Sequence, residues 1–143
     1  MRRNGLTSLW LSLVILWAAG LASAHGAWGQ FSDIPITANL MADVNGDGNM
    51  ELLVGCKDGF VRVYRISDGA ILGKVCVGSP VTGIAAQGSN IVVGSRGGVR
   101  LYDASLKEKG ALNIRAVSVV ALKGKTPAVC VADETGTVYA LGF

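Results

Sequence analysis

The sequence predicts an all-β fold built from repeated units of short antiparallel strands. The first observation is a repeat, in which similar segments occupy residues 51–64, 90–102 and 127–141. The second is that apolar and polar residues alternate within these segments, as they do along half-buried strands. The third is that no stretch after the first 24 residues keeps the apolar spacing of three and four that an amphipathic helix requires.

Each repeated segment has the pattern of a hairpin, with an apolar strand, a short turn rich in glycine or charge, and a second strand. Another strand is expected before each hairpin, and a fourth is expected after the first two. The preceding strands are at 35–41, 80–86 and 116–122, and the fourth strands are around 70–77 and 111–114. Four strands in about 40 residues is the layout of one β-propeller blade.

We therefore predict a repeat region over residues 34–143 with about three β-propeller blades of four antiparallel strands, at 34–77, 78–114 and 115–143. Closed propellers have four to eight blades. Three blades would make a propeller that is incomplete or is completed by an oligomer. A β-sandwich is the alternative, although it does not require a similar hairpin at a regular interval.

The alternation also predicts how the strands pack. In residues 60–64, Val61 and Val63 point to one side, whereas Arg62 and Tyr64 point to the other. This pattern predicts an outer strand that is packed on one face only. The strands before the hairpins are more uniformly apolar, which favours a place between neighbouring blades.

The first 24 residues have the pattern of a signal peptide. Arg2 and Arg3 precede an apolar run, and small residues at 22–24 form a cleavage pattern. An uncleaved anchor is the alternative, because the 19 residues from 6 to 24 are barely long enough to cross a bilayer. Cleavage would leave residues 25–33 as an N-terminal segment and would place the protein in the cell envelope or outside the cell, with no membrane span.

The remaining chain is nearly neutral. The formal net charge of +3 falls to +1 when the two leader arginines are removed. No basic surface for nucleic acid is therefore expected. The cysteines are odd in number, so at least one is left unpaired within the chain, and we expect Cys56 and Cys130 to be small buried strand residues.

The residues with the clearest chemistry lie between the first two predicted strands, in the sequence Asp-Val-Asn-Gly-Asp-Gly-Asn-Met-Glu. Oxygen-bearing side chains fall at alternate positions, and a calcium ion takes six to eight oxygen ligands. Two glycines supply the backbone angles that a tight curl needs. We predict that calcium is held by Asp43, Asn45, Asp47, Asn49 and Glu51, with Asn49 contributing its backbone carbonyl.

Other interpretations of this loop fit less well. An EF-hand requires a glutamate at the twelfth position, which is Val54 here, and helices on both sides. Magnesium keeps several of its waters and rarely takes a cage made only of protein ligands. A solvated Asn-Gly-Asp-Gly turn without metal is the simpler alternative.

Residues 42–55 resemble the core of the FG-GAP/VCBS repeats, which occur in integrin-like β-propellers and in many exported bacterial proteins. The resemblance covers one blade and implies a calcium ion bound by the five residues named above. The second and third blades are more similar to WD40-like or quinoprotein-type repeats, through residues such as 136–141. The tryptophan expected after the strand-turn-strand step at 64–72 is missing, so a quinone cofactor is not supported.

No catalytic constellation is evident. The only histidine is His25, at the start of the predicted mature chain, and adjacent Asp133 and Glu134 fit a solvated turn. We therefore predict a non-catalytic, exported, calcium-binding β-propeller module that contacts a protein or a glycan, with the calcium in a structural role. The alternative is an accessory fragment of an exported polysaccharide-degrading or quinoprotein-like enzyme.

Overall fold

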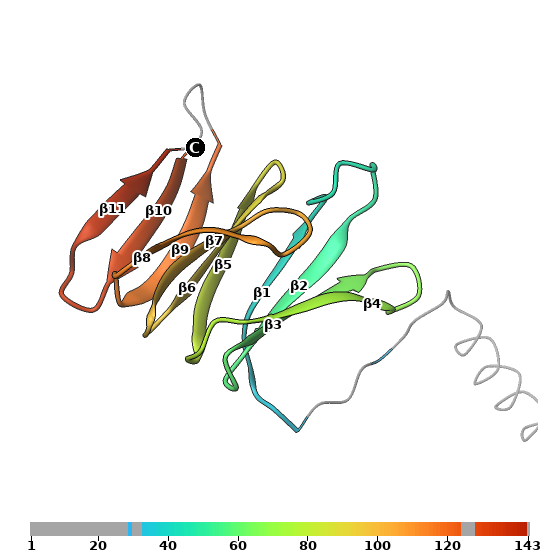
Figure 1. The fold of residues 1–143 in the computed structure, drawn as a ribbon, viewed down its shortest axis with the longest axis horizontal. Coiled ribbons are helices and arrows are strands. Elements are labelled where there is room, and N and C mark those ends of the chain that lie inside the picture. Colours follow the sequence, from blue (N-terminus) through green and yellow to red (C-terminus); the bar gives the residue numbers. More distant parts are fainter. Residues whose placement is uncertain (1–28, 30–32, 124–127, 143) are drawn as a thin grey trace, which may run out of the picture.

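The structure is a computed structural model that describes residue 29, residues 33–123 and residues 128–142. Within these residues the chain forms antiparallel β-sheets, which confirms the all-β prediction (Figure 1). The predicted signal peptide, His25 and the loop at 124–127 lie outside the described residues. No helix in the described part of the chain has the length and hydropathy of a membrane span.

The described strands form three sheets that follow one another along the chain. The first sheet has the order β1 (Ile36–Ala42), β2 (Glu51–Cys56), β3 (Phe60–Arg65) and β4 (Ile71–Cys76). The second has the order β5 (Val81–Gln87), β6 (Asn90–Ser95), β7 (Gly98–Tyr102) and β8 (Glu108–Leu112). The third has the order β9 (Ala116–Leu122), β10 (Ala128–Asp133) and β11 (Val138–Leu141).

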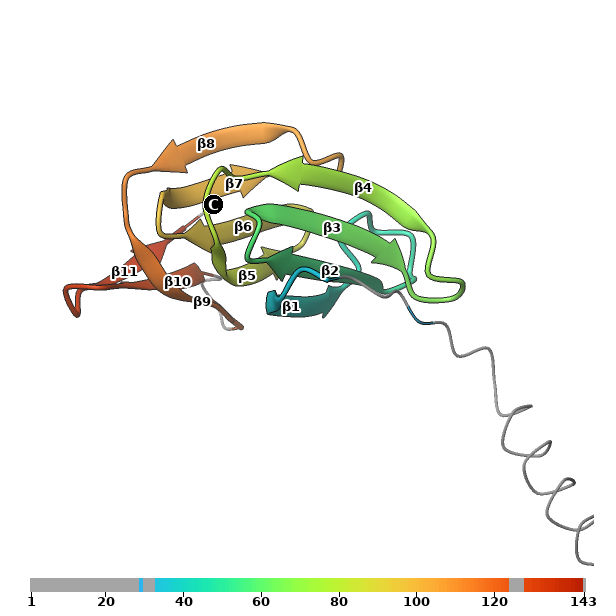
Figure 2. The ribbon, with the colours of Figure 1, turned by 90° about the horizontal axis from the view of Figure 1, so that it is seen from below.

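The three sheets are arranged as successive blades of an incomplete propeller. The first strand of each sheet lies innermost, so that β1 packs beside β5 and β5 packs beside β9 (Figure 1). The later strands of the first two sheets, β4 and β8, lie outermost (Figure 2). The predicted order of strands within a blade is therefore confirmed.

Apolar side chains fill the two spaces between neighbouring sheets. Leu53, Val61 and Val63 of the first sheet meet Ile91 and Val93 of the second. A second cluster fills the space between the second and third sheets, and its members that are at most 2 % exposed are Ala85, Val92, Val99, Ala116, Val129 and Val131. Burial of the aliphatic side chains in these two layers is the main favourable term for the fold.

The prediction that the second hairpin strand packs on one face only was wrong. Tyr102 of β7 is only 1 % exposed, although it points away from Val99 and towards the first sheet. Its counterpart Tyr64 of β3 is also buried, with Cys56 and the partly buried Ile34 as neighbours. Alternation could not reveal this burial, because the apolar ring of a tyrosine lies on the side that polar residues otherwise occupy.

The fourth strand of the second sheet begins three residues earlier than predicted. β8 covers Glu108–Leu112 and contains the charged pair Glu108 and Lys109, which gives no apolar pattern. The strand is held by its pairing with β7 and by a 2.8 Å ion pair between Glu108 and Arg100. This edge strand therefore depends on backbone pairing rather than on hydrophobic periodicity.

The cysteines follow the prediction in part. Cys56 is buried, Cys130 is only half-buried, and Cys76 is exposed. All three are free thiols in the structure.

Candidate metal centre

The loop predicted to bind calcium joins β1 to β2. The pair Ala42 and Glu51 closes its base, because these two residues face each other in the ladder between the strands. Val44 anchors the loop, since its side chain is buried in the core between the first two sheets. Sequence reasoning missed this anchor, although an apolar residue at the second position of a polar loop is a signal for it.

Two glycines give the loop its curl. Gly46 and Gly48 have φ values of +75° and +86°, a conformation that residues with a side chain rarely adopt. The predicted need for special backbone angles at these two positions is thereby confirmed.

Asp43 organises the backbone of the loop. Its Oδ1 accepts hydrogen bonds from the Gly46 and Asp47 N–H groups at 2.7 and 3.2 Å, and its Oδ2 accepts one from the Gly48 N–H at 3.0 Å. Three donors on one carboxylate fold the chain around that carboxylate. Asp43 therefore lies inside the curl of the loop.

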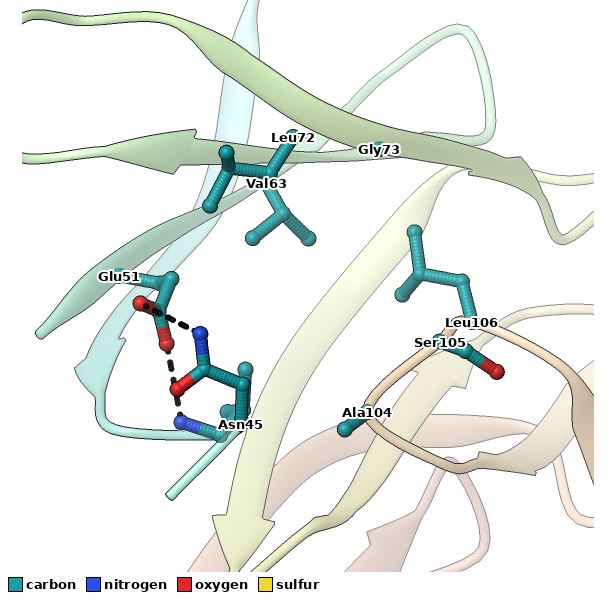
Figure 3. Close-up of a pocket in the computed structure, with 9 residues that line it drawn as sticks. Asn45, Glu51, Val63, Leu72, Gly73, Ala104, Ser105 and Leu106 are labelled. Carbon is teal, nitrogen blue, oxygen red and sulfur yellow. Dashed lines mark hydrogen bonds between the residues drawn. The ribbon is translucent and has the colours of Figure 1, made fainter. Parts of the chain in front are cut away.

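Three other predicted ligands lie together. The Asn45 Nδ2 donates to Glu51 Oε1 at 3.4 Å (Figure 3). It also donates to Asp47 Oδ2 at 3.0 Å, so the amide nitrogen lies between two carboxylates. The backbone N–H of Asn49 donates a 2.7 Å hydrogen bond to Asp47 Oδ1. The loop thus brings Asn45, Asp47 and Glu51 to a common point, with Asn49 beside them.

Glu51 is the most unusual member of the group. It is 2 % exposed, and its Oε2 accepts a 3.1 Å hydrogen bond from the Val44 N–H. Within the described residues its carboxylate forms no ion pair with a lysine or arginine, so its partners are neutral. Burying a carboxylate is costly unless a cation or several donors compensate its charge.

As the side chains lie, no group of three or more acidic, histidine or cysteine side chains in the described part of the chain could hold a metal ion. The loop's own N–H groups donate hydrogen bonds to the carboxylates of Asp43 and Asp47. The donor set still suits a hard cation, because it combines three carboxylates and an amide on one nine-residue segment.

Two cavities flank the loop and share Asn45, Glu51 and Leu72. The smaller, of about 250 Å³, reaches across to Ser105 and Leu106 of the second sheet (Figure 3). The larger, of about 410 Å³, lies towards Arg65 and the turn after β3. The loop therefore has open space on both sides.

Several turn aspartates carry pKa values below the ordinary value of 3.8. A hydrogen bond from the Asn49 N–H lowers the pKa of Asp47. The pKa of Asp133 is lowered most by a 2.7 Å hydrogen bond from the Thr135 hydroxyl to Asp133 Oδ1. A second hydrogen bond to the same oxygen, from the Thr137 N–H at 2.9 Å, lowers it further. The Asp133 and Glu134 pair thus forms the expected turn, with Glu134 in an ion pair with Arg115.

These shifts predict acid sensitivity. A carboxyl group whose pKa is lower in the folded state stabilises the fold fully above its unfolded pKa, near 3.8, and loses that contribution as the pH falls through the folded pKa. Stability should therefore be flat from pH 7 to 5 and fall steeply below about pH 4. Asp133→Asn should reduce the fall between pH 5 and 3 in urea unfolding curves, and an equally steep fall in this variant would contradict the assignment.

Comparison with known proteins shows likeness in structure only. No family model matches the chain, and no curated protein matches it. Among solved structures, Sqt1 from Saccharomyces cerevisiae matches with a TM-score of 0.63 and 15 % identity over 76 % of this chain and 31 % of that one. BBS1N, solved in complex with ARL6DN, matches with a TM-score of 0.66 and 16 % identity over 85 % of this chain and 41 % of that one.

A computationally designed protein, Ika4, matches with a TM-score of 0.52 and 16 % identity over 81 % of this chain and 99 % of that one. The chain thus spans less than half of the two natural neighbours and nearly all of the designed one. Sqt1 and BBS1N have WD40-like propeller folds. Identities this low establish the fold alone, and the three blades described above have that of an incomplete β-propeller.

Proposed function

We propose that the chain is a calcium-stabilised β-propeller module of FG-GAP/VCBS type, exported from the cell, that contacts a protein or a glycan and catalyses no reaction. Asp43, Asn45, Asp47, Asn49 and Glu51 would hold the ion. The ion would have a structural role, because the loop joins β1 to β2 and is anchored by Val44 in the core.

The observation that carries the proposal is the buried Glu51 carboxylate. It faces Asp47 across the Asn45 amide nitrogen, and the neutral donors at Val44 and Asn45 leave its charge uncompensated. A divalent cation between these groups would supply the missing positive charge. The same cation would relieve the repulsion between the carboxylates of Asp47 and Glu51.

The interaction role is supported by the fold and by the lack of a cluster of metal-binding side chains among the residues that the structure describes. The described residues contain loops of varied length at the ends of the blades, which is where propeller-like scaffolds can present binding residues. Packing explains the buried Cys56, and turn hydrogen bonds explain Asp133. We therefore assign contact with a partner, rather than chemistry, to this chain.

Glu51→Gln tests the metal site directly. Glutamine keeps the shape of the side chain but removes its charge. In a calorimetric titration, calcium should bind this variant at least about tenfold more weakly than the wild type, which corresponds to ~1.4 kcal/mol. In chelator the variant should be more stable than the wild type by about 1 kcal/mol, since an uncompensated buried charge is gone.

Glu108→Gln is the matched control. Glu108 is an exposed glutamate in an ion pair with Arg100, outside the loop. Its substitution should leave calcium affinity unchanged and should change stability little, because exposed ion pairs contribute only about 0–1 kcal/mol. Equal calcium affinity in wild type and Glu51→Gln would refute the assignment of Glu51 as a ligand.

A further inference from the structure

The loop between β1 and β2 contains a peptide bond that is prone to chemical change. Asn45 is followed directly by Gly46, and both residues are exposed. The backbone nitrogen that follows an asparagine can attack the side-chain amide carbon and form a cyclic imide, and a glycine leaves that nitrogen open because it has no Cβ atom. The other Asn-Gly pair of the chain, Asn4 and Gly5, lies in the predicted signal peptide and outside the described residues.

The Gly46 nitrogen is uncrowded and faces a base. A Cβ atom on Gly46 would meet nothing within 4 Å, so the space around this peptide group is open. The Gly46 N–H donates to Asp43 Oδ1 at 2.7 Å. A carboxylate at this distance from the proton that must leave has the position of a general base.

The carbonyl group of the Asn45 side chain is polarised. Its Oδ1 accepts a 2.9 Å hydrogen bond from the Asp47 N–H, which also makes a longer one of 3.2 Å to Asp43 Oδ1. Oδ1 becomes negative when a nitrogen adds to Cγ, so a donor placed there stabilises the charge as in an oxyanion hole. The same hydrogen bond closes a ring of atoms that includes the Gly46 nitrogen, which keeps the side chain folded towards the group that attacks it.

The amide nitrogen that must depart is held by two carboxylates. Asn45 Nδ2 donates to Asp47 Oδ2 at 3.0 Å and to Glu51 Oε1 at 3.4 Å. Figure 3 shows the amide turned with this nitrogen towards Glu51. These two bonds fix the orientation of the amide, so that its oxygen rather than its nitrogen faces the Asp47 N–H.

We propose that Asn45 is a self-modification site, at which the loop converts asparagine into aspartate and isoaspartate. Asp43 takes the proton of the Gly46 N–H, and the Gly46 nitrogen forms a bond to Asn45 Cγ. The bond between Cγ and Nδ2 then breaks, and Nδ2 takes a proton from water and leaves as ammonia, while Asp43 returns its proton to water. Water adds to either carbonyl carbon of the imide and opens the ring, so the net reaction consumes one water and releases one ammonia.

The modification changes the charge of the candidate metal centre. The aspartate product replaces the neutral amide between Asp47 and Glu51 by a carboxylate, and calcium loops gain affinity as the number of charged ligands rises. For its effect on calcium, this inference rests on the proposed function and adds a step that strengthens the site. Because each chain reacts once, on itself, the proposed role in contacting a partner is unchanged.

The rate in the folded protein is the first test. The protein is kept in chelator and heavy-oxygen water near neutral pH, and mass spectrometry follows the conversion of residue 45. Asn45 should react at least about tenfold faster in the folded protein than in a synthetic peptide that copies residues 42–52, which lacks the fixed base and donor. Asn49, in the same loop but followed by Met50, should stay unchanged. An equal or slower reaction in the folded protein would overturn the proposal, because an ordinary exposed Asn-Gly turn has no such acceleration.

Asp43→Asn tests the base. Asparagine keeps the shape and an acceptor oxygen but does not take up the proton, so the reaction should slow at least about tenfold. Asp133→Asn is the matched control with a wild-type rate, since it changes a turn aspartate of the third sheet that also accepts backbone N–H bonds. A wild-type rate in a folded Asp43→Asn variant would overturn the proposal, and if this variant does not fold, the comparison with the peptide still decides.

Asn45→Asp tests the effect on the metal centre, because it has the side chain of the aspartate product. In a calorimetric titration it should bind calcium at least about tenfold more tightly than the wild type. Equal calcium affinity in the two proteins would overturn the inference that the modification strengthens the site.

Calcium separates this inference from the proposed metal site. Excess calcium should slow the reaction at least about tenfold, because the ion would take the oxygens of Asp43 and Asn45. If Asn45 reacts fast but calcium changes neither the rate nor the thermal stability, self-modification stands and the proposed metal site is wrong. If calcium stabilises the protein but Asn45 reacts no faster than in the peptide, self-modification is wrong and the metal site stands.

Discussion

Thermal unfolding of this chain is expected to occur roughly 10 °C or more higher in excess calcium than in chelator. An ion present at 100 times its dissociation constant adds about 2.7 kcal/mol to the folded state. For a domain of this size each kcal/mol moves the midpoint by about 4–8 °C. The physical source of the effect is the set of carboxylates on one loop, above all the buried carboxylate of Glu51.

Asp47→Ala should abolish most of this difference. Asp47 Oδ2 shares the Asn45 amide with Glu51, so it belongs to the group that the ion would join. The matched control is Asp133→Ala, which removes another exposed aspartate with a lowered pKa and a hydrogen-bonded turn, but in the third sheet. Scanning calorimetry should show the full calcium shift in the control, and a full shift in Asp47→Ala as well would place the ion elsewhere.

The sequence was a good guide to the strands because its repeat and its alternation record which positions face a core. Val61 and Val99, matched across two repeats, are both buried between sheets. The same reasoning failed for β8, since Glu108 and Lys109 occupy an edge that is held by backbone pairing. It also failed for Tyr102, because the amphipathic tyrosine ring occupies a face that alternation assigns to solvent.

For the loop, the sequence predicts which residues would be ligands, and that set stays a prediction, but it does not predict the geometry. The spacing of acids and glycines predicted five ligands, Asp43, Asn45, Asp47, Asn49 and Glu51, and it also predicted the positive φ of Gly46. Nothing in the local sequence indicates that the Glu51 side chain is buried. Its burial arises from the pairing of β1 with β2 and from the packing of the adjacent sheet, which are contacts between distant parts of the chain.

The repeated glycines of the hairpins show how closely the blades must approach each other. Gly55 and Gly94 occupy matching places in β2 and β6, and each faces the innermost strand of the next sheet. A Cβ atom on Gly94 would lie 2.4 Å from Val119 Cγ2 and 2.9 Å from Ala116 Cβ. Neither of these glycines has a positive φ, so the absence of a side chain serves packing rather than backbone conformation.

Gly94→Val should therefore destabilise the protein by about 3 kcal/mol or more, because the third sheet must move away from the second to make room. The thermal midpoint should fall by roughly 15 °C. Gly110→Val is the matched control, since a Cβ atom there meets nothing within 4 Å and valine favours strands. Its midpoint should equal or exceed that of the wild type.

A double-mutant cycle locates the clash. Val119→Ala removes the methyl group nearest to position 94, so Gly94→Val combined with Val119→Ala should cost less than the sum of the two single substitutions. Additive costs would mean that the strain lies within β6 rather than between the sheets. Because the same contact recurs between Gly55 and Val81, the cycle measures the interaction that fixes the spacing of successive blades.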